Sequence, residues 1–330
     1  MDKIKLAFIG VGGIAQGHVE RSLKLPDVQV VALADTNDVN IQRTKEKHGL
    51  DHVAVYADYR DLLAKSQPDA VVISTPHALH YQQIVDSVDA GAHVLAEKPM
   101  VCRSEDGWAL VEKLKGSDRV VGLAYQRHCA PAYRYIRDEI AGGKSGKVQY
   151  VAAILHQGWA RGTMGSWRQD PALSGGGQIN DSGSHVVDMM LWATGLVPAR
   201  VVAFMENRGT PVDINSAISI QFEGGAQGSI AVIGDAAGWY EDNSYWTDHA
   251  SYSFRTGLGF KVLDDSGKPV DVALPAEVNV NEDFIRAIQG KEEVAAKPID
   301  GLRTITLTEA FWKSAAAGGA VVDVDRSPWM

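Results

Sequence analysis

Residues 5–15 read KLAFIGVGGIA, and this stretch decides the fold class. An apolar run of strand type leads into Gly10-x-Gly12-x-x-Ala15 and then into a segment that favours a helix, up to about Leu25. In dinucleotide-binding folds the first glycine allows a tight turn. The second lets the backbone approach a pyrophosphate, and a small third residue lets helix and strand pack closely. Because the N–H groups at the helix N-terminus attract phosphate, the stretch predicts a dinucleotide-binding unit.

An acidic residue stands where such a unit binds the ribose. The second strand pattern, Val28–Ala34, ends at Asp35, which lies 20 residues after Ala15. A carboxylate there accepts both ribose hydroxyls of NAD and repels the additional phosphate of NADP. The sequence therefore predicts NAD rather than NADP as the cofactor. The alternative is a generic strand–turn–helix in which Asp35 is a solvated loop residue.

Composition is that of an ordinary globular protein. The chain has 330 residues, 45% hydrophobic and 22% charged, which is enough for two domains with full cores. The net charge of −9 gives no reason to expect a nucleic-acid or membrane partner. The two cysteines, Cys102 and Cys129, are too few for a disulfide framework. No transmembrane run or signal peptide is recognised, so we expect a cytoplasmic protein.

Strand and helix patterns alternate along the first third of the chain. The further strands predicted are Val53–Tyr56, Ala70–Ser74, His93–Ala96 and Val120–Ala124, and the helices between them are Tyr59–Lys65, His80–Ala90 and Ser104–Leu114. Such alternation predicts a parallel sheet with right-handed crossovers, in a first domain over residues 1–124. Ligands bind at the carboxyl ends of such strands, where Thr75-Pro76 and Glu97-Lys98-Pro99 stand.

Longer strand patterns dominate the remaining residues, 125–330. They are Val148–His156, Ala199–Met205, Ala217–Phe222, Gly228–Ile233, Ser251–Phe254 and Gly259–Leu263, with helices predicted over Pro131–Ala141, Asp181–Thr194 and Ile305–Ala316. Few helices separate these strands, and Gly-containing turns join several of them. We therefore predict a second domain of α+β type with a large, mostly antiparallel open sheet.

Lys98 is the first candidate for chemistry, because it follows a predicted parallel strand, between Glu97 and Pro99. A lysine held there can donate to a substrate oxygen and stabilise negative charge that develops on it. The alternative is an exposed lysine in a turn, which is the commoner situation for this residue type.

The second candidate lies in residues 175–188, which read GGGQINDSGSHVVD. On the helix predicted from Asp181, that residue and His185 are four positions apart and share one face. Histidine suits proton transfer because its ordinary pKa is about 6.5, and a neighbouring carboxylate would orient the ring. Alternatively, Asp181 is a helix N-cap and His185 is a partly buried histidine with no catalytic role.

Together these segments resemble the motifs of the Gfo/Idh/MocA family, which is named after glucose–fructose oxidoreductase, inositol dehydrogenase and a rhizopine-catabolism protein. The motifs that carry the resemblance are Gly10–Ala15, Thr75-Pro76 with His80, Glu97-Lys98-Pro99, and Gly175–Gly177 followed by Asp181 and His185. Residues 300–318 also resemble the last helix of that family, so the likeness covers nearly the whole chain.

The resemblance implies an N-terminal Rossmann domain and oxidation of a secondary alcohol of a sugar, sugar derivative or inositol-like cyclitol by NAD. In this mechanism His185 takes the hydroxyl proton, Asp181 orients His185 and binds the reacting hydroxyl, and Lys98 stabilises the alkoxide. The cofactor-binding residues that the resemblance implies are Gly10, Gly12, Gly13, Ile14, Ala15, Asp35, Thr75, Pro76, His80, Glu97, Lys98, Gln126 and Arg168. Gln126-Arg127 is a departure, since the family usually has Asn-Arg there.

The substrate is less well defined by the sequence. The implied substrate-binding residues are Lys98, Arg127, Trp159, Arg161, Trp167, Asp181 and His185. Tryptophan favours the apolar face of a sugar ring, and arginine binds hydroxyls, a carboxylate or a phosphate, so a phosphorylated or acidic sugar stays open. The alternative, that one or both of Arg161 and Arg168 bridge domains or contact the cofactor pyrophosphate, also stays open.

An aromatic-rich stretch, Gly238–Tyr252, lines the substrate pocket or lies at a subunit interface. An open antiparallel sheet also needs covering, so we expect a homodimer or homotetramer through that sheet. We predict no metal site, because His77 and His80 lack ligand partners at a usable spacing.

Two other functions are compatible with the same motifs. One is an NAD-dependent glycosidase that acts through transient oxidation and keeps the same base and lysine. The other is a non-catalytic NAD-sensing regulator. Such regulators typically lose the catalytic lysine or histidine, and both are present here as Lys98 and His185.

Overall fold

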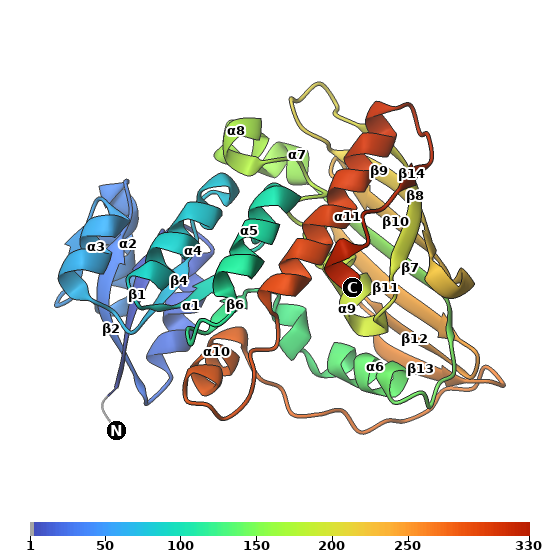
Figure 1. Cartoon of the computed structure of the whole chain (residues 1–330), viewed down its shortest axis with the longest axis horizontal. Coiled ribbons are helices and arrows are strands. Elements are labelled where there is room, and N and C mark those ends of the chain that lie inside the picture. Colours follow the sequence, from blue (N-terminus) through green and yellow to red (C-terminus); the bar gives the residue numbers. More distant parts are fainter. Residues whose placement is uncertain (1–2) are drawn as a thin grey trace. The chain divides into compact units, whose positions relative to one another are not determined.

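The structure is a computed structural model that describes residues 3–330. The chain divides into two compact units, whose elements are labelled in Figure 1. The first unit comprises Met1–Val101, Glu105–Gln126 and Val278–Pro298, and the second comprises Cys102–Ser104, Arg127–Glu277 and Ile299–Met330. Residues 1–2 of the predicted first domain lie outside the described residues. The boundary at residue 124 stays a prediction, and it does not include the return of residues 278–298 to the first unit.

The first unit contains a parallel sheet of six strands among the described residues, in the order β3-β2-β1-β4-β5-β6. Its strands are β1 (Ile4–Ile9), β2 (Val28–Ala34), β3 (Ala54–Tyr56), β4 (Ala70–Ile73), β5 (His93–Ala96) and β6 (Val121–Leu123). This strand order is that of a Rossmann fold, in which the ligand lies beyond the carboxyl ends of the strands next to the point where the order reverses. The predicted α/β class and parallel sheet are confirmed.

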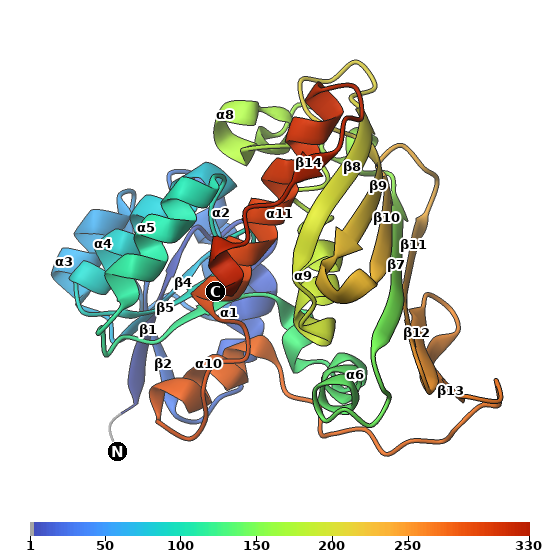
Figure 2. The ribbon, with the colours of Figure 1, turned by 45° about the vertical axis from the view of Figure 1, so that its right-hand side comes forward.

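Helices cover both faces of this sheet. They are α1 (Ala15–Leu23), α2 (Asp38–His48), α3 (Tyr59–Ser66), α4 (His80–Asp89), α5 (Ser104–Leu114) and α10 (Val280–Ile288). Figure 2 shows α3, α4 and α5 on one side of the sheet, and α1 and α2 on the other. The sequence analysis did not predict α2, because its only buried residues are Ile41 and Thr44 and its apolar pattern is weak. Asn37 starts this helix by accepting the Val39 N–H.

The second unit is built on a sheet of eight strands among the described residues, ordered β13-β12-β11-β7-β10-β9-β8-β14. The strands are β7 (Val148–Gln157), β8 (Pro198–Glu206), β9 (Asn215–Phe222), β10 (Gln227–Ile233), β11 (Trp239–Thr247), β12 (Ala250–Arg255), β13 (Gly259–Asp264) and β14 (Val322–Asp323). Within this eight-stranded sheet of the described residues, β7 and β10 form the one parallel pair, and the other pairs are antiparallel. The predicted mostly antiparallel sheet is confirmed.

Three helices, α6 (Pro131–Ala141), α9 (Ser184–Thr194) and α11 (Pro298–Ala316), pack on one face of this sheet. Their apolar side chains share a core with the strands, as Ile136, Val187 and Phe311 illustrate. Figure 2 shows no helix among the described residues of the second unit on the opposite face, where Phe204 and Trp246 are exposed. The predicted homo-oligomer through this sheet stays a prediction.

The aromatic-rich stretch 238–252 forms two strands, β11 and part of β12, which the sequence analysis did not separate. Tyr245 on β11 is 1% exposed, whereas its neighbour Trp246 is 40% exposed. Alternation between the two faces of the sheet explains this difference. The polar and aromatic residues of β11 mask that alternation in the sequence.

Candidate active site

The glycine-rich turn after β1 has the shape that a bound pyrophosphate needs. Gly10 has a φ of +80°, and a Cβ there would lie 2.7 Å from Cγ2 of Thr75. Side chains at Gly12 or Gly13, in contrast, would meet no atom within 4 Å. Gly10 is therefore required by packing against the end of β4, while Gly12 and Gly13 leave the backbone open to a ligand. Ile14, the N-cap residue of α1, makes no capping hydrogen bond and is 51% exposed.

Gln16 holds this turn in place. It lies in the first turn of α1, and its Nε2 donates to the carbonyl oxygens of Val11 at 3.1 Å and Gly12 at 3.2 Å. The same nitrogen lies 2.8 Å from Oγ1 of Thr44 on α2. The sequence analysis missed Gln16, because spacing alone does not show that a helix side chain folds back over the preceding loop.

Asp35 follows β2 as predicted and closes onto the same turn. Its Oδ2 accepts the Val11 N–H at 2.9 Å, and its Oδ1 accepts the Asn37 N–H at 2.8 Å. Nδ2 of Asn40 also donates to Oδ2, at 3.2 Å. Carboxylate oxygens accept more than one hydrogen bond each, so these contacts leave acceptor capacity on Oδ1 for a ribose hydroxyl. The residues present therefore fit a dinucleotide: an open glycine turn, an uncapped helix N-terminus and an acidic residue beside it.

His80 is a buried side chain whose hydrogen bonds connect two of the predicted motifs. Its side chain is fully buried, with Nδ1 2.8 Å from the Pro99 oxygen and Nε2 3.0 Å from the Thr75 oxygen. Burial lowers the pKa of His80, although the two carbonyl groups oppose that effect. Thr75 is held in turn by Gln83, whose Oε1 accepts its hydroxyl at 2.6 Å. A side chain this buried reaches a cofactor only through the backbone that it holds in place.

Glu97 and Lys98 follow β5, and the peptide bond between Lys98 and Pro99 is cis. Oε1 of Glu97 lies 3.0 Å from Nε2 of His18 on α1, and Oε2 accepts the Lys98 N–H at 3.1 Å. Burial by itself raises the pKa of Glu97, but the hydrogen bond and charge of His18, together with Lys98, outweigh burial and lower it. Glu97 is thus held as a buried carboxylate. The sequence analysis did not identify His18.

In the second unit Asp181 lies three residues before α9 and not on it, so the prediction that Asp181 and His185 share a helix face is wrong. His185 is the second residue of that helix, and Gly183 is its N-cap, which also excludes Asp181 from that role. The helix does not start earlier because residues 178–183 form turns, with the Gly183 N–H bonded to the Gln178 oxygen at 2.8 Å.

Asp181 instead gathers other predicted residues around it. Its Oδ2 accepts hydrogen bonds from Nε1 of Trp159 at 2.9 Å and from Nε of Arg168 at 3.0 Å. The guanidinium carbon of Arg168 lies 4.4 Å from the centre of the Trp167 ring. Four of the predicted site residues, from three separate segments, therefore form one polar and aromatic cluster.

Asp213, which the sequence analysis did not identify, clamps the glycine triplet. Its Oδ1 accepts the Gly177 N–H at 3.0 Å and Nε1 of Trp312 at 3.0 Å, and its Oδ2 accepts the Ile179 N–H at 2.9 Å. A Cβ at Gly177 would lie only 1.9 Å from the Asp213 carbonyl oxygen. The triplet therefore lets two backbone segments meet, and this contact fixes the path of the chain toward Asp181.

The other two predicted arginines are placed differently. Arg127 forms an ion pair with Glu241 on β11, a carboxylate that is 2% exposed. Arg161 is exposed, and its Nη2 lies 3.5 Å from the Ala236 oxygen. Gln126 begins the short 3-10 helix Gln126–Cys129, at the junction between the two units. Of the two arginines, Arg127 is the one whose charge is balanced by a buried carboxylate.

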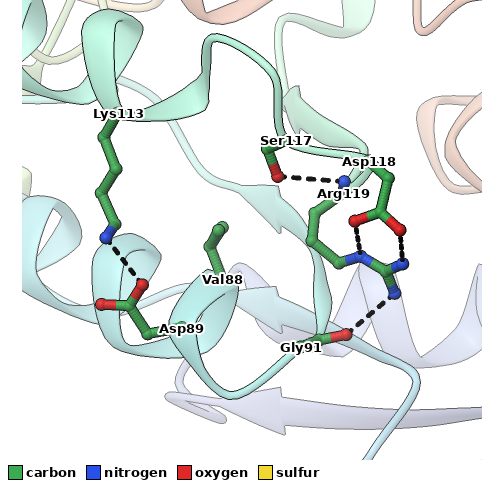
Figure 3. A pocket seen from close by; sticks show the side chains of 7 residues that line it. All are labelled: Val88, Asp89, Gly91, Lys113, Ser117, Asp118 and Arg119. Atoms are coloured by element: carbon green, nitrogen blue, oxygen red, sulfur yellow. Dashed lines mark hydrogen bonds and ion pairs between the residues drawn. The ribbon is translucent and has the colours of Figure 1, made fainter.

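A surface hollow of the first unit, drawn in Figure 3, does not have the chemistry of a ligand site. Its cations are already paired, with Lys113 2.6 Å from Asp89 and Arg119 bonded to Asp118 through two nitrogens. Its lining includes Gly91 and Ser117–Arg119, which precede β5 and β6 and so lie at the amino ends of those strands. Ligands of such sheets bind at the opposite ends.

Within residues 3–330, no three or more His, Cys, Asp or Glu side chains gather in a way that could hold a metal ion. The helices of the same residues are all too short or too polar to cross a membrane.

Comparison with known proteins agrees with these observations. Residues 4–125 match the N-terminal domain of the GFO/IDH/MocA family, described as "Oxidoreductase family, NAD-binding Rossmann fold". Residues 133–248 match the GFO/IDH/MocA C-terminal domain. The chain is 26% identical to the 1,5-anhydro-D-fructose reductase of Ensifer adhaerens over 94% of this chain and 96% of that protein. It is 34% identical to a glycosyl hydrolase family 109 protein of Shewanella baltica, over 34% of this chain and 26% of that protein.

Among solved structures, levoglucosan dehydrogenase in complex with NADH superimposes with a TM-score of 0.88 at 21% identity, covering 98% of this chain and all of that chain. At that identity the superposition establishes the fold. The two matched domains together with the NAD-binding turn show that the first unit binds NAD and that the protein is an NAD(P)-dependent oxidoreductase. The chain belongs to the Gfo/Idh/MocA family.

Proposed function

We propose that this protein is an NAD-dependent dehydrogenase that oxidises a secondary alcohol of a neutral sugar, sugar derivative or cyclitol. The observation that carries the proposal is the cluster around Asp181, which combines this carboxylate with two tryptophans and an arginine. Asp181 itself lies four residues before His185 in the sequence. Tryptophan faces favour the C–H face of a sugar ring, and carboxylates bind hydroxyl groups. The relatives' names, an anhydrofructose reductase and a levoglucosan dehydrogenase, support a sugar substrate.

The charge of the cluster favours a neutral substrate. Arg168 is paired with Asp181, and Arg127 with Glu241, so neither guanidinium carries an unbalanced charge. A site for a sugar phosphate or sugar acid typically presents arginine forks that bind the anion directly. Among the three arginines predicted for the substrate or cofactor, this leaves Arg161, which is exposed.

The proposed mechanism assigns one role to each predicted catalytic residue. His185 accepts the hydroxyl proton of the substrate as general base, a role worth about 10²–10⁴-fold in rate. Lys98 donates a hydrogen bond to the same oxygen as it becomes an alkoxide. Asp181 binds the substrate hydroxyl and is itself kept in place by Trp159 and Arg168. Bound NAD supplies the hydride acceptor.

Two groups of residues position the cofactor in this proposal. Gly10, Gly12, Gly13, Ile14 and Ala15 present the open backbone turn, and Asp35 binds the ribose. Thr75, Pro76, His80, Glu97 and Gln126 shape the remaining loops, and Arg168 is assigned to Asp181 and not to the pyrophosphate.

The test is a panel of cyclitols, neutral aldoses, glycosides, sugar acids and sugar phosphates, assayed for NADH formation and, with ketosugars, for NADH consumption. NAD and NADP are run in parallel. We expect turnover with at least one neutral class and a higher kcat/KM with NAD. Turnover only with acidic or phosphorylated sugars contradicts the charge argument.

The partial similarity to a glycosyl hydrolase family 109 protein favours one alternative, a glycosidase that uses bound NAD for a transient oxidation. Such an enzyme releases the aglycone of an aryl glycoside without net formation of NADH. Aryl glycoside cleavage in the absence of any NADH signal selects this alternative. NAD binding without turnover on either panel selects the NAD-sensing regulator.

A further inference from the structure

A buried hydrogen-bond network links α1, the end of β5 and α10. Glu97 was predicted for the site, but its partners His18 and Asn281 were not. His18 on α1 has no exposed surface. Its Nε2 lies 3.0 Å from Oε1 of Glu97, and its Nδ1 lies 3.0 Å from Oδ1 of Asn281 on α10. Asn281 is 263 residues away in sequence and 2% exposed. The turn that carries Lys98 is therefore tied to two helices through one histidine.

The contacts of Asn281 decide which of its amide atoms faces His18. Arg21 donates its Nε–H to Oδ1 of Asn281 at 2.9 Å, and Nδ2 of Asn281 donates to the Ser22 hydroxyl at 3.1 Å. A flipped amide would place its NH₂ group against the guanidinium of Arg21, which is always a donor. Oδ1 thus faces Nδ1 of His18, and that ring nitrogen must carry a proton.

The other ring nitrogen faces a carboxylate. Nε2 of His18 lies 3.0 Å from Oε1 of Glu97 and donates to this carboxylate, whose second oxygen accepts the Lys98 N–H at 3.1 Å. With both ring nitrogens donating, His18 is an imidazolium paired with a buried carboxylate. The lowered pKa of Glu97, in which His18 opposes the effect of burial, agrees with this state.

We infer that His18 and Asn281 are positioning residues, which hold the Glu97 carboxylate in one orientation and thereby fix the backbone from which Lys98 projects. The inference rests on the proposed function, because it assigns the network to the alcohol oxidation in which Lys98 acts. A buried carboxylate without its donor would turn toward other partners, so the Lys98 N–H would lose its acceptor. Asn281 acts one step further out, by keeping Nδ1 of His18 protonated.

The groups that face the pair all come from the same unit. Besides His18 and Glu97 they are Arg21, which donates to Asn281, and Lys98, whose N–H binds Glu97. His80 also lies close enough for its pKa to be affected by Glu97 and Lys98.

The first experiment compares His18→Leu with His93→Leu in the full-length protein. His93 is a matched control, because it lies at the other end of β5 and also makes a hydrogen bond, from the Val120 N–H at 2.8 Å. We expect His18→Leu to lower kcat per NADH-binding site by about 10–100-fold, with NADH affinity within about threefold of wild type. His93→Leu is expected to keep kcat. Equal kcat values in the two variants overturn the positioning role.

The second comparison separates orientation from simple packing. Asn281→Asp keeps an acceptor for both His18 and Arg21, whereas Asn281→Leu removes it at similar volume. We expect Asn281→Asp to retain most of the wild-type kcat and Asn281→Leu to lose about tenfold. A purely structural contact predicts that both variants lose stability and that neither changes kcat per folded molecule.

A readout without turnover distinguishes a failure of this inference from a failure of the proposed function. In protein labelled with ¹⁵N-histidine, the signal that disappears in His18→Leu is expected to be that of a doubly protonated ring at neutral pH. A neutral ring at position 18 overturns the inference even if the enzyme is active. If His18 is an imidazolium but the protein oxidises no sugar, the proposed function is contradicted and the inference about His18 is not.

Discussion

Arg168 and Asp181 form an ion pair in which Nε of the arginine lies 3.0 Å from Oδ2 of the carboxylate. The Asp181 side chain is 8% exposed and that of Arg168 is 33% exposed, so the pair stands at the edge of the protein interior. Both residues were predicted for the site, but for different partners. Arg168 was predicted for the cofactor and Asp181 for the substrate, and from this contact we propose that Arg168 orients Asp181.

Replacing Arg168 tests this assignment. We expect Arg168→Met to lower kcat/KM for a neutral sugar by about 10–100-fold, because Asp181 loses a charge-assisted hydrogen bond and its fixed orientation. Arg208→Met is the control, because Arg208 is exposed and forms its ion pair with Glu206, two residues away on the surface. A variant that loses only acidic or phosphorylated substrates would show that Arg168 binds the anion directly.

The catalytic assignment predicts a loss of turnover without a loss of cofactor. Lys98→Met and His185→Ala are each expected to lower kcat by at least about 10²-fold, because each removes a group that acts on the reacting oxygen. NADH binding, measured by titration of its fluorescence, is expected to stay close to that of wild type. Turnover near the wild-type level in either variant removes that residue from the mechanism.

Asp35 predicts the preference between the two nicotinamide cofactors. Asp35→Asn keeps the size of the side chain but removes its charge. We expect the ratio of kcat/KM for NAD to that for NADP to fall by about tenfold or more, since a charge-assisted hydrogen bond contributes about 1.5–3 kcal/mol. Steady-state kinetics with both cofactors provide the measurement. An unchanged ratio leaves Asp35 with a structural role alone, as the acceptor for the Val11 and Asn37 N–H groups and the Asn40 side chain.

We expect a small substitution at Gly177 to lower the stability of the protein strongly. In Gly177→Ala the Cβ would lie 1.9 Å from the Asp213 oxygen, which is backbone and cannot rotate away. We expect the free energy of unfolding to fall by about 3 kcal/mol or more. Gly162→Ala is the control, because a Cβ there meets no atom within 4 Å, and it is expected to change stability by less than about 0.5 kcal/mol. Denaturant unfolding of both variants decides the comparison.

His93 predicts a dependence of stability on pH. Burial, with the charge of Arg119, lowers the pKa of His93 in the folded protein, and its Nδ1 accepts the Val120 N–H. Below the ordinary histidine pKa of about 6.5, the unfolded chain binds a proton that the folded protein resists. The contribution of His93 is therefore present above that pH and lost as the pH falls below it. The difference in unfolding free energy between wild type and His93→Leu is expected to shrink between pH 8 and pH 5, and a constant difference contradicts it.

The sequence analysis was most successful where a residue's role depends on its neighbours in the chain. Gly10 needs a positive φ, and the strand before it is a short apolar run, so the β1 turn could be recognised locally. It was least successful for α10, whose residues belong to the first unit although they follow most of the second. Nothing local in residues 280–288 indicates which sheet they pack against.

The start of α9 shows the same limit on a smaller scale. The pattern of Asp181 and His185 four residues apart is typical of a helix, but the helix begins only at Ser184. Asp181 lies instead in the turns of residues 178–183, in which the Gly183 N–H binds the Gln178 oxygen. A four-residue spacing does not distinguish a helix from the turns that precede it.

By itself the sequence determined the class of this protein: a glycine turn for a pyrophosphate, alternating strands and helices, and the ordered motifs around Lys98 and His185. These depend on backbone conformation and on hydrophobic period, which act over a few residues. Only the tertiary structure decided the partners of the polar side chains, such as His18 with Asn281 and Asp181 with Arg168. A buried polar group takes the donor or acceptor that packing brings to it, and packing joins residues that are far apart in the chain.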